Sequence, residues 1–119
     1  MGQSNYKSLI VWQKSIVLTK EIYILTSQFP KEEIYGLVNQ IRRSVVSIPS
    51  NIAEWNQRQT QKEYKNFLYI AKGSCAELET QIIIAKELGF IVDHTSEEIL
   101  KKIEELLKML SALITSIHT

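Results

Sequence analysis

Residues 95–117 read TSEEILKKIEELLKMLSALITSI and carry the clearest structural signal in the chain. Their apolar residues recur at spacings of 4, 3, 4, 3 and 4, which predicts an amphipathic helix with one buried row. The row consists of Ile99, Ile103, Leu106, Leu110, Leu113 and Ile117. Thr95 and Glu98 have the spacing of a capping box, so we expect this helix to begin there.

The same period recurs in three earlier segments. Their predicted buried rows are Leu18, Ile22, Leu25 and Phe29, then Ile34, Val38, Ile41, Val45, Ile48, Ile52 and Trp55, and finally Tyr64, Leu68, Ala71, Cys75, Leu78, Ile82 and Ala85. Thr60 and Glu63 form a second capping box, and Gly89 stands where a left-handed residue often ends a helix. The predicted helices cover about 7–28, 31–56, 61–88 and 96–118. Because the connections are short, we expect one domain over residues 1–119, an all-α, up-down-up-down antiparallel four-helix bundle.

The overall composition agrees with a helical protein. Only four glycines and two prolines occur in 119 residues, which excludes a β-sandwich or barrel with its frequent turns. Hydrophobic residues make up 45% and charged residues 23%, which excludes a disordered or collagen-like chain. The formal net charge is only +1, so there is no global basic field of the kind that marks many nucleic-acid binders.

Compartment and cofactors follow from simple counts. The longest apolar runs, such as 9–12 and 82–85, fall far below the roughly 20 residues that span a bilayer. A single cysteine, Cys75, excludes an intramolecular disulfide and a multi-cysteine zinc site. We expect a cytoplasmic protein with no cofactor, no metal, no membrane association and no small-molecule substrate.

Three predicted helices carry apolar residues outside the buried row. A monomeric bundle buries one row per helix, so a second row is either part of a wide core face or a surface for self-association. We favour self-association because the extra row recurs in three helices. Its residues are Trp12, Ile16 and Tyr23, then Phe67, Ile70, Ile84 and Leu88, and finally Leu100, Leu107 and Ile114.

Residues 47–54, SIPSNIAE, place Pro49 inside a predicted helix. Proline cannot donate to the carbonyl of Val45, and it costs ~3 kcal/mol or kinks the helix. The buried row keeps its phase across Pro49, so we predict a kinked but continuous helix. A structural bend is one interpretation, and a polar site made of the freed Val45 carbonyl, Ser50 and Asn51 is the other.

Polar residues with helical spacing flank this bend. Arg43, Ser47, Ser50, Glu54 and Arg58 share one face of their predicted helix, and Gly73, Ser74, Glu77 and Gln81 share one face of the next. Our hypothesis is that these faces meet in a partly buried Arg–Glu network, where removing Glu77 would cost several kcal/mol. Gly73 costs ~1 kcal/mol relative to Ala, so we expect another backbone to approach it closely.

Catalytic motifs are missing from the sequence. A carboxylate di-metal bundle needs Glu three residues before His, but Ile91 holds that place before His94. Thr115 holds it before His118. Cys75 lies in a buried row, so we interpret it as a structural thiol. We therefore expect a protein without enzyme activity.

Basic residues on the first three predicted helices point to a different class of function. They would offer a positive surface to the phosphates of RNA or DNA, especially if an oligomer repeated it. An ordinary solvated helix face is the alternative interpretation, and Glu54 and Glu63 dilute the charge. The candidates are Lys14, Lys20, Arg42, Arg43, Arg58, Lys62, Lys65 and Lys72.

Three segments, SIPSNIAE (47–54), FLYIAKGS (67–74) and ELETQ (77–81), form a specific combination. With them the chain resembles, over nearly its whole length, the four-helix-bundle family of the intervening-sequence protein of bacterial 23S ribosomal RNA genes, also called the S23 family. This resemblance implies a ring-shaped homopentamer. It also implies kinship with the accessory variability proteins of diversity-generating retroelements, which are basic pentamers that bind nucleic acid and a reverse transcriptase.

The resemblance implies a set of motif residues that are structural rather than catalytic. They are Pro49, Asn51, Glu54, Arg58, Gly73, Ser74, Glu77 and Thr80. Trp55 stands where the family has Gly, and the near-neutral charge weakens the transfer of nucleic-acid binding. We expect a non-enzymatic oligomeric scaffold or accessory protein with RNA or DNA as a candidate partner. The alternative is a structural or protein-interaction module without a nucleic-acid role.

Overall fold

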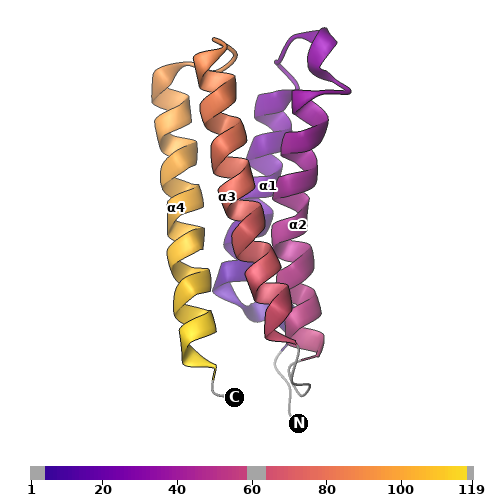
Figure 1. The fold of residues 1–119 in the computed structure, drawn as a ribbon, viewed down its shortest axis with the longest axis vertical. Helices are drawn as coiled ribbons and strands as arrows, with labels where there is room; N and C mark the ends of the chain where they lie inside the picture. Colours follow the sequence, from indigo (N-terminus) through magenta and orange to yellow (C-terminus); the bar gives the residue numbers. More distant parts are fainter. Residues whose placement is uncertain (1–4, 59–63, 118–119) are drawn as a thin grey trace.

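The computed structural model describes residues 5–58 and 64–117, and these residues form four α-helices and no strand. The helices are α1 (Ile10–Thr26), α2 (Leu37–Gln57), α3 (Lys65–Glu87) and α4 (Asp93–Ser116). A short 3-10 turn at Tyr6–Ser8 precedes α1, and another at Lys31–Glu33 precedes α2. The molecule measures 48 × 23 × 21 Å, because the helices lie side by side along its long axis (Figure 1). The predicted all-α four-helix bundle is confirmed.

The helices occupy the four corners of the bundle. α2 packs against α1 and α3, α4 packs against α3 and α1, and no Cα atoms of the described parts of α1 and α3 lie within 8 Å of each other. In Figure 1, α3 lies in front and α1 behind. The 27–36 connection and the 88–92 turn lie at one end and both termini at the other, as an up-down-up-down order requires (Figure 1).

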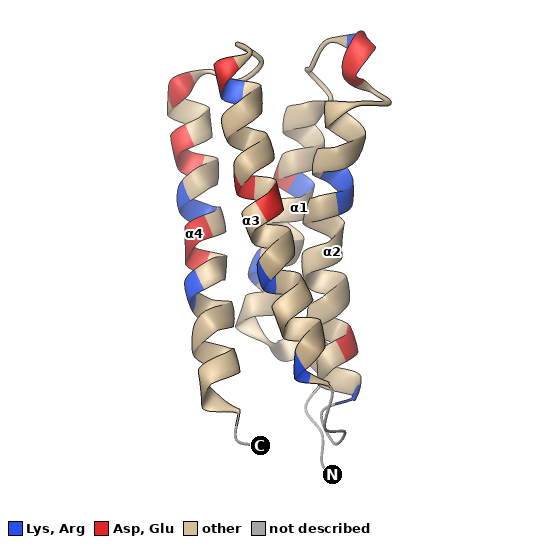
Figure 2. Cartoon of the chain, in the orientation of Figure 1, with Lys and Arg blue, Asp and Glu red and all other residues tan. Residues whose placement is uncertain are grey.

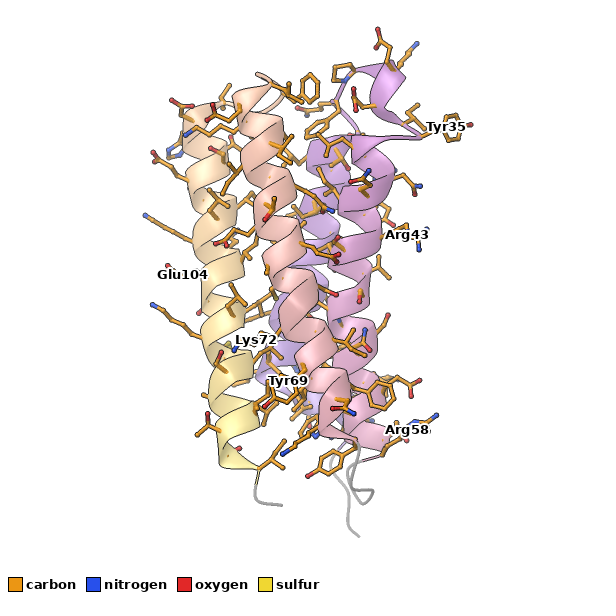
Figure 3. The ribbon with its side chains drawn as sticks, in the orientation of Figure 1. Tyr35, Arg43, Arg58, Tyr69, Lys72 and Glu104 are labelled. Atoms are coloured by element: carbon orange, nitrogen blue, oxygen red, sulfur yellow. The ribbon has the colours of Figure 1, made fainter. Side chains whose placement is uncertain are left out.

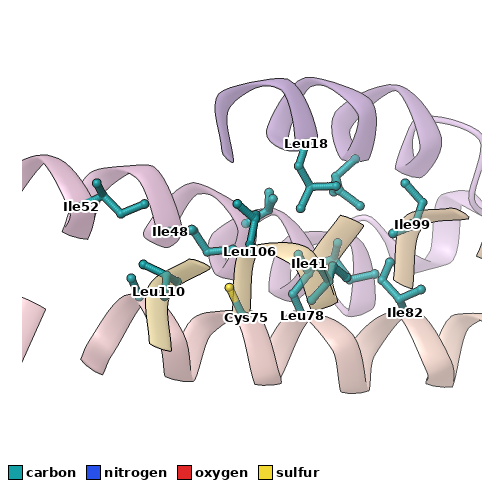
Figure 4. Close-up of a cluster of buried hydrophobic side chains, with 14 of the residues drawn as sticks. Leu18, Ile41, Ile48, Ile52, Cys75, Leu78, Ile82, Ile99, Leu106 and Leu110 are labelled. Carbon is teal, nitrogen blue, oxygen red and sulfur yellow. The ribbon is translucent and has the colours of Figure 1, made fainter. Parts of the chain in front are cut away.

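The predicted buried rows form the core (Figure 4). Ile41, Ile48, Leu78, Ile103 and Leu110 are among the side chains that have no contact with solvent. Burying each such side chain stabilises the fold by about 1.5–3 kcal/mol. The row of α4 loses burial toward its end, where Leu113 and Ile117 are half-buried.

Trp55, at the end of α2, extends the buried row as its spacing predicts. Its ring stacks on Tyr64, with 6.2 Å between centroids and 24° between planes. The indole nitrogen finds no acceptor among the described residues. The large ring therefore contributes through apolar packing at the end of α2.

The beginning of α2 differs from the prediction. We expected a helix from residue 31, but Pro30 leads into a 3-10 turn and α2 begins at Leu37. The Glu33 carboxylate accepts a hydrogen bond from the backbone N–H of Leu37 at 3.3 Å, so it satisfies a donor in the first turn. Ile34, predicted to be buried, is exposed because it precedes the helix.

The turn between α3 and α4 confirms one helix end and corrects another. Gly89 has φ +82°, and its N–H and that of Phe90 donate to carbonyls of the last turn of α3, each at 2.9 Å. The capping box at Thr95 is wrong, because α4 begins at Asp93, where the carboxylate suits the positive helix end. The capping box at 60–63 lies outside the described residues.

Candidate functional site

Pro49 lies buried inside α2, which continues on both sides of it. The Thr19 hydroxyl of α1 donates to the Ser15 carbonyl of its own helix at 2.7 Å and lies 3.4 Å from the Val45 carbonyl that Pro49 leaves free. Ser50 is exposed, and the Asn51 side chain turns back onto its own helix. The three groups of the predicted polar site therefore do not converge, and the free carbonyl faces the Thr19 hydroxyl of α1. The kink at Pro49 stays a prediction.

Two motif residues meet at Ser47. The Ser74 hydroxyl of α3 donates to the Ser47 hydroxyl oxygen at 2.8 Å. The Asn51 amide donates to the carbonyl and hydroxyl oxygens of Ser47 at 2.8 and 3.0 Å. Since Ser74 is buried and Ser47 half-buried, this small network fixes the register of α2 against α3.

An open polar groove of about 470 Å³ lies beside this network. Arg43 lines its α2 side, and Glu77 and Gln81 line its α3 side. Arg43 and Glu77 are both exposed, and neither forms an ion pair with a described residue (Figure 3). The predicted partly buried Arg–Glu network is therefore wrong, because the Ser47–Ser74 contact joins the two helices instead.

Gly73 is exposed on α3, and a Cβ atom added to it would meet no heavy atom within 4 Å. The close backbone approach that we expected does not occur within the chain. The helix therefore carries the ~1 kcal/mol cost of glycine without an intramolecular reason.

The remaining motif side chains make local contacts. The Thr80 hydroxyl donates to the Ala76 carbonyl at 3.0 Å, one turn earlier in α3. The predicted pair of Glu54 and Arg58 is confirmed, with 2.9 Å between Oε1 and Nε. Both side chains are half exposed, so this pair contributes only a few tenths of a kcal/mol.

Among the basic candidates, Arg42 has a structural role. Its Nε donates to the Thr26 hydroxyl at 2.9 Å and its guanidinium also donates to the Tyr23 carbonyl at 3.3 Å. The guanidinium carbon lies 4.5 Å from the centre of the Tyr23 ring. These contacts connect α2 with the end of α1, so Arg42 is already engaged within the bundle.

The other basic candidates are distributed over several faces (Figure 2). Lys20 and Arg43 are exposed without an ion pair among the described residues, whereas Lys65 and Lys72 are half-buried. In Figure 3, Arg43 lies at the outer edge of α2 and Lys72 on the α4 side of α3, so they face different directions. Lys62 lies outside the described residues.

A second groove, of about 470 Å³, lies between α1 and α4 and has no counterpart in the sequence analysis. Two ion pairs connect its sides, Lys14–Glu105 at 3.3 Å and Glu21–Lys102 at 2.6 Å. Lys14, one of the basic candidates, is therefore neutralised by α4. The periodic pattern gave no sign of these pairs because each joins helices far apart in the sequence.

Cys75 is fully buried in α3. Burial, together with the nearby Glu79 carboxylate, raises the pKa of its thiol from an ordinary 9.0 to about 12. The thiol therefore stays protonated at neutral pH and is a poor nucleophile. Across 5–58 and 64–117 no three His, Cys, Asp or Glu residues group as metal ligands would, and no helix could cross a membrane.

The outer apolar residues divide into two groups. Five of the ten predicted side chains pack against the core and are half-buried: Trp12, Phe67, Leu100, Leu107 and Ile114. The other five are exposed: Ile16, Tyr23, Ile70, Ile84 and Leu88. The wide-core interpretation thus holds for α4, whereas α1 and α3 present apolar residues to solvent.

The sequence analysis missed the most exposed apolar row, on α1. Ile10, Val17 and Ile24 follow one another every seven residues and are 61%, 57% and 59% exposed. Their heptad spacing was visible in the sequence. The neighbouring row of Leu18 and Ile22 has a similar period and is the one that is buried. Spacing alone therefore does not show that the row of Ile10, Val17 and Ile24 is exposed.

These features define a small helical-bundle protein. Its surface carries two open grooves and two helix faces with exposed apolar side chains. The chain belongs to the family of the 23S rRNA-intervening sequence protein, whose family model matches residues 7–112. It is similar to a solved protein of unknown function from the S23 ribosomal protein family of Bacteroides thetaiotaomicron, with a TM-score of 0.81 and 26% sequence identity. That match covers 90% of this chain and 96% of the other. No curated protein sequence matches the chain.

Proposed function

We propose that this chain is a non-enzymatic protein that associates with copies of itself and acts as a scaffold or accessory factor. The supporting observation is the exposure of apolar side chains on α1 and α3, including Ile10, Val17 and Ile24. Contiguous exposed apolar surface marks interaction sites. Moving such side chains out of water favours association by about 25 cal/mol per Å² of apolar surface.

The arrangement of these two faces supports a ring. α1 and α3 lie diagonally opposite each other in the bundle (Figure 1), with no Cα atoms of their described residues within 8 Å. When two different faces of identical copies meet, the contact is head-to-tail and generates a closed ring if the rotation closes. This geometry is in keeping with the homopentamer that the family resemblance implies. Kinship with retroelement accessory proteins and a cytoplasmic location stay predictions.

The absence of enzyme activity is part of the proposal. Its support is that three side chains with nucleophilic atoms, those of Cys75, Ser47 and Ser74, are engaged in the packing of the bundle. Cys75 is a buried, protonated thiol, and the hydroxyls of Ser47 and Ser74 are bonded to each other. Neither arrangement offers an activated nucleophile.

Multi-angle light scattering on the purified chain tests the self-association. We expect a mass several times 13.7 kDa at micromolar concentration, and five times that mass for a pentamer. A particle of 13.7 kDa over the whole concentration range would contradict the proposal.

RNA or DNA binding is a second candidate function, supported by the exposed Arg43, which forms no ion pair with a described residue and which a ring would repeat around its axis. The alternative remains a structural module without a nucleic-acid role. Filter binding to structured RNA across a salt series separates the two, because phosphate contacts weaken steeply with salt. Replacing Arg43 by Gln should reduce the salt dependence, whereas no binding at low salt would exclude this candidate.

A further inference from the structure

The outer sides of α1 and α3 have the same heptad pattern. The α1 face consists of Ile10, Gln13, Val17, Lys20 and Ile24. The α3 face consists of Ile70, Gly73, Glu77, Thr80 and Ile84. All ten residues are exposed, and on both faces they follow at spacings of 3, 4, 3 and 4, as in the contact rows of coiled coils.

Contacts within the chain give the relative height of the two faces along the bundle axis. Thr19 of α1 contacts the Val45 carbonyl at 3.4 Å, so these residues lie at the same height. Ser47 and Ser74 contact each other at 2.8 Å and also share a height. α2 and α3 run in opposite directions (Figure 1), so Val45 lies level with Ala76, two residues after Ser74.

Thr19 of α1 and Ala76 of α3 therefore lie at the same height. Both helices start at the end of the bundle where the two chain termini lie and run toward the opposite end (Figure 1). Each residue advances about 1.5 Å along the helix axis. Lys20 thus lies level with Glu77, and Val17 lies within one residue of the height of Gly73. Rotation about an axis parallel to the helices keeps each residue at its height in every copy.

The residues that this symmetry brings together are complementary. Lys20 and Glu77 have opposite charges, are exposed, and form no ion pair within the described chain. Gly73 leaves open space on α3 near the height of Val17, enough to receive a side chain of a neighbouring copy. Ile70 lies at the height of Gln13, between Ile10 and Val17, so the isoleucine does not meet an apolar residue of the α1 face head-on.

We propose that the α1 face of one copy packs in parallel on the α3 face of the next, with Val17 over Gly73 and Lys20 paired with Glu77. The proposal rests on the self-association proposed above and specifies its interface. It explains why a helix keeps Gly73, whose side-chain position is empty within one chain. It also explains why apolar rows without an intramolecular partner occur on these two helices.

Charge exchange tests the ion pair. Lys20→Glu and Glu77→Lys should each weaken association roughly tenfold, because like charges then meet at every interface. The double variant should recover association to within about threefold of the unmodified chain. Lys20 and Glu77 are exposed on diagonally opposite helices with no Cα atoms within 8 Å, so this recovery reports contacts between copies. Lys108→Glu and Glu104→Lys, exposed on α4, are the matched controls and should leave association unchanged.

Gly73→Leu tests the packing without endangering the fold, because the new side chain points into open space and leucine favours helices. We expect an unchanged or raised melting temperature of the chain and loss of association. Ala112→Leu, exposed on α4, is the control and should keep association.

The outcomes distinguish this interface from the self-association itself. An unmodified chain that is monomeric at micromolar concentration overturns both proposals. An unmodified chain that associates, and whose association Lys20→Glu, Glu77→Lys and Gly73→Leu all leave unchanged, overturns only the interface between the α1 face and the α3 face.

Discussion

The two sides of α3 share one helix and one spacing but differ in what surrounds them. On the inner side, Leu68, Cys75 and Leu78 are fully buried among the other helices. On the outer side, Ile70 and Ile84 are 50% and 43% exposed, although they are as apolar as the core residues. Packing within one chain explains why the inner side of α3 is apolar. It does not explain why the outer side carries exposed isoleucines.

This difference shows how far a heptad pattern can be interpreted. Periodicity reports that a row of side chains is suited to burial, but it does not tell which partner buries it. In α3 one row is buried by α2 and α4, and the proposed partner of the other is a second copy. The predictions below are ways to test this division.

The largest expected effect is on the inner side. Leu78→Ala should lower the free energy of unfolding by about 3–5 kcal/mol, because the fully buried side chain leaves a cavity. Ile84→Ala on the outer side should change the unfolding of dilute chain by less than about 0.5 kcal/mol. Urea denaturation at several protein concentrations measures both.

The same experiment separates packing within a chain from packing between copies. Association makes unfolding depend on protein concentration. Ile84→Ala should reduce that dependence, whereas Leu78→Ala should lower stability at every concentration. Equal losses for the two variants in dilute solution would contradict the division between the two sides.

The inner side also predicts a pH effect through Cys75. Its thiol has a pKa of about 12 in the folded chain against 9.0 ordinarily, so above pH 9 the unfolded chain loses this proton first. The unfolded state is then favoured, and stability falls by up to about 1.4 kcal/mol per pH unit, an effect that is absent below pH 9. The stability difference between the unmodified chain and Cys75→Ala should therefore shift in favour of the variant from about pH 9 to pH 11. A constant difference would show that the thiol titrates as it does in water.

A smaller effect of opposite sign is expected on the outer side. Gly73→Ala should raise the free energy of unfolding of dilute chain by about 1 kcal/mol, because alanine favours the helix and its Cβ meets no neighbour. Thermal unfolding followed by circular dichroism measures this change. A destabilised variant would mean that Gly73 is required by packing within the chain.

The smallest effect concerns Glu77. A buried ion-pair network would make Glu77→Ala cost several kcal/mol, but the exposed, unpaired side chain predicts less than about 0.5 kcal/mol in dilute chain. Chemical denaturation against the unmodified chain gives the value. A loss of more than about 2 kcal/mol in the free energy of unfolding would contradict this description. It would indicate that Glu77 takes part in a buried ion-pair network between α2 and α3.

Much of the fold could be predicted from the sequence, because apolar periodicity and helix-end residues act locally. The buried rows around Ile48, Leu78 and Ile103 were predicted, as was the left-handed Gly89. The beginnings of α2 and α4 were not predicted. A residue that can cap a helix, such as Thr95, does so only where the preceding turn ends at it, and here the helix has already begun at Asp93.

Less of the candidate site could be predicted. Which of two rows on α1 faces inward depends on where α2 and α4 lie, so the exposure of Val17 was not visible. Of the motif residues, Asn51 and Ser74 meet at Ser47, and the contact that joins the two helices is between Ser47 and Ser74 rather than between Arg43 and Glu77. Side-chain pairing across helices depends on their relative rotation, which periodicity does not specify.

The central claim is that the outer sides of α1 and α3 are covered by further copies of this chain. Sedimentation equilibrium of the unmodified chain at micromolar concentration tests it most directly. The account predicts a mass several times 13.7 kDa, five times that mass for a ring of five, and a return toward 13.7 kDa for Gly73→Leu. A mass of 13.7 kDa for the unmodified chain at every concentration would contradict it.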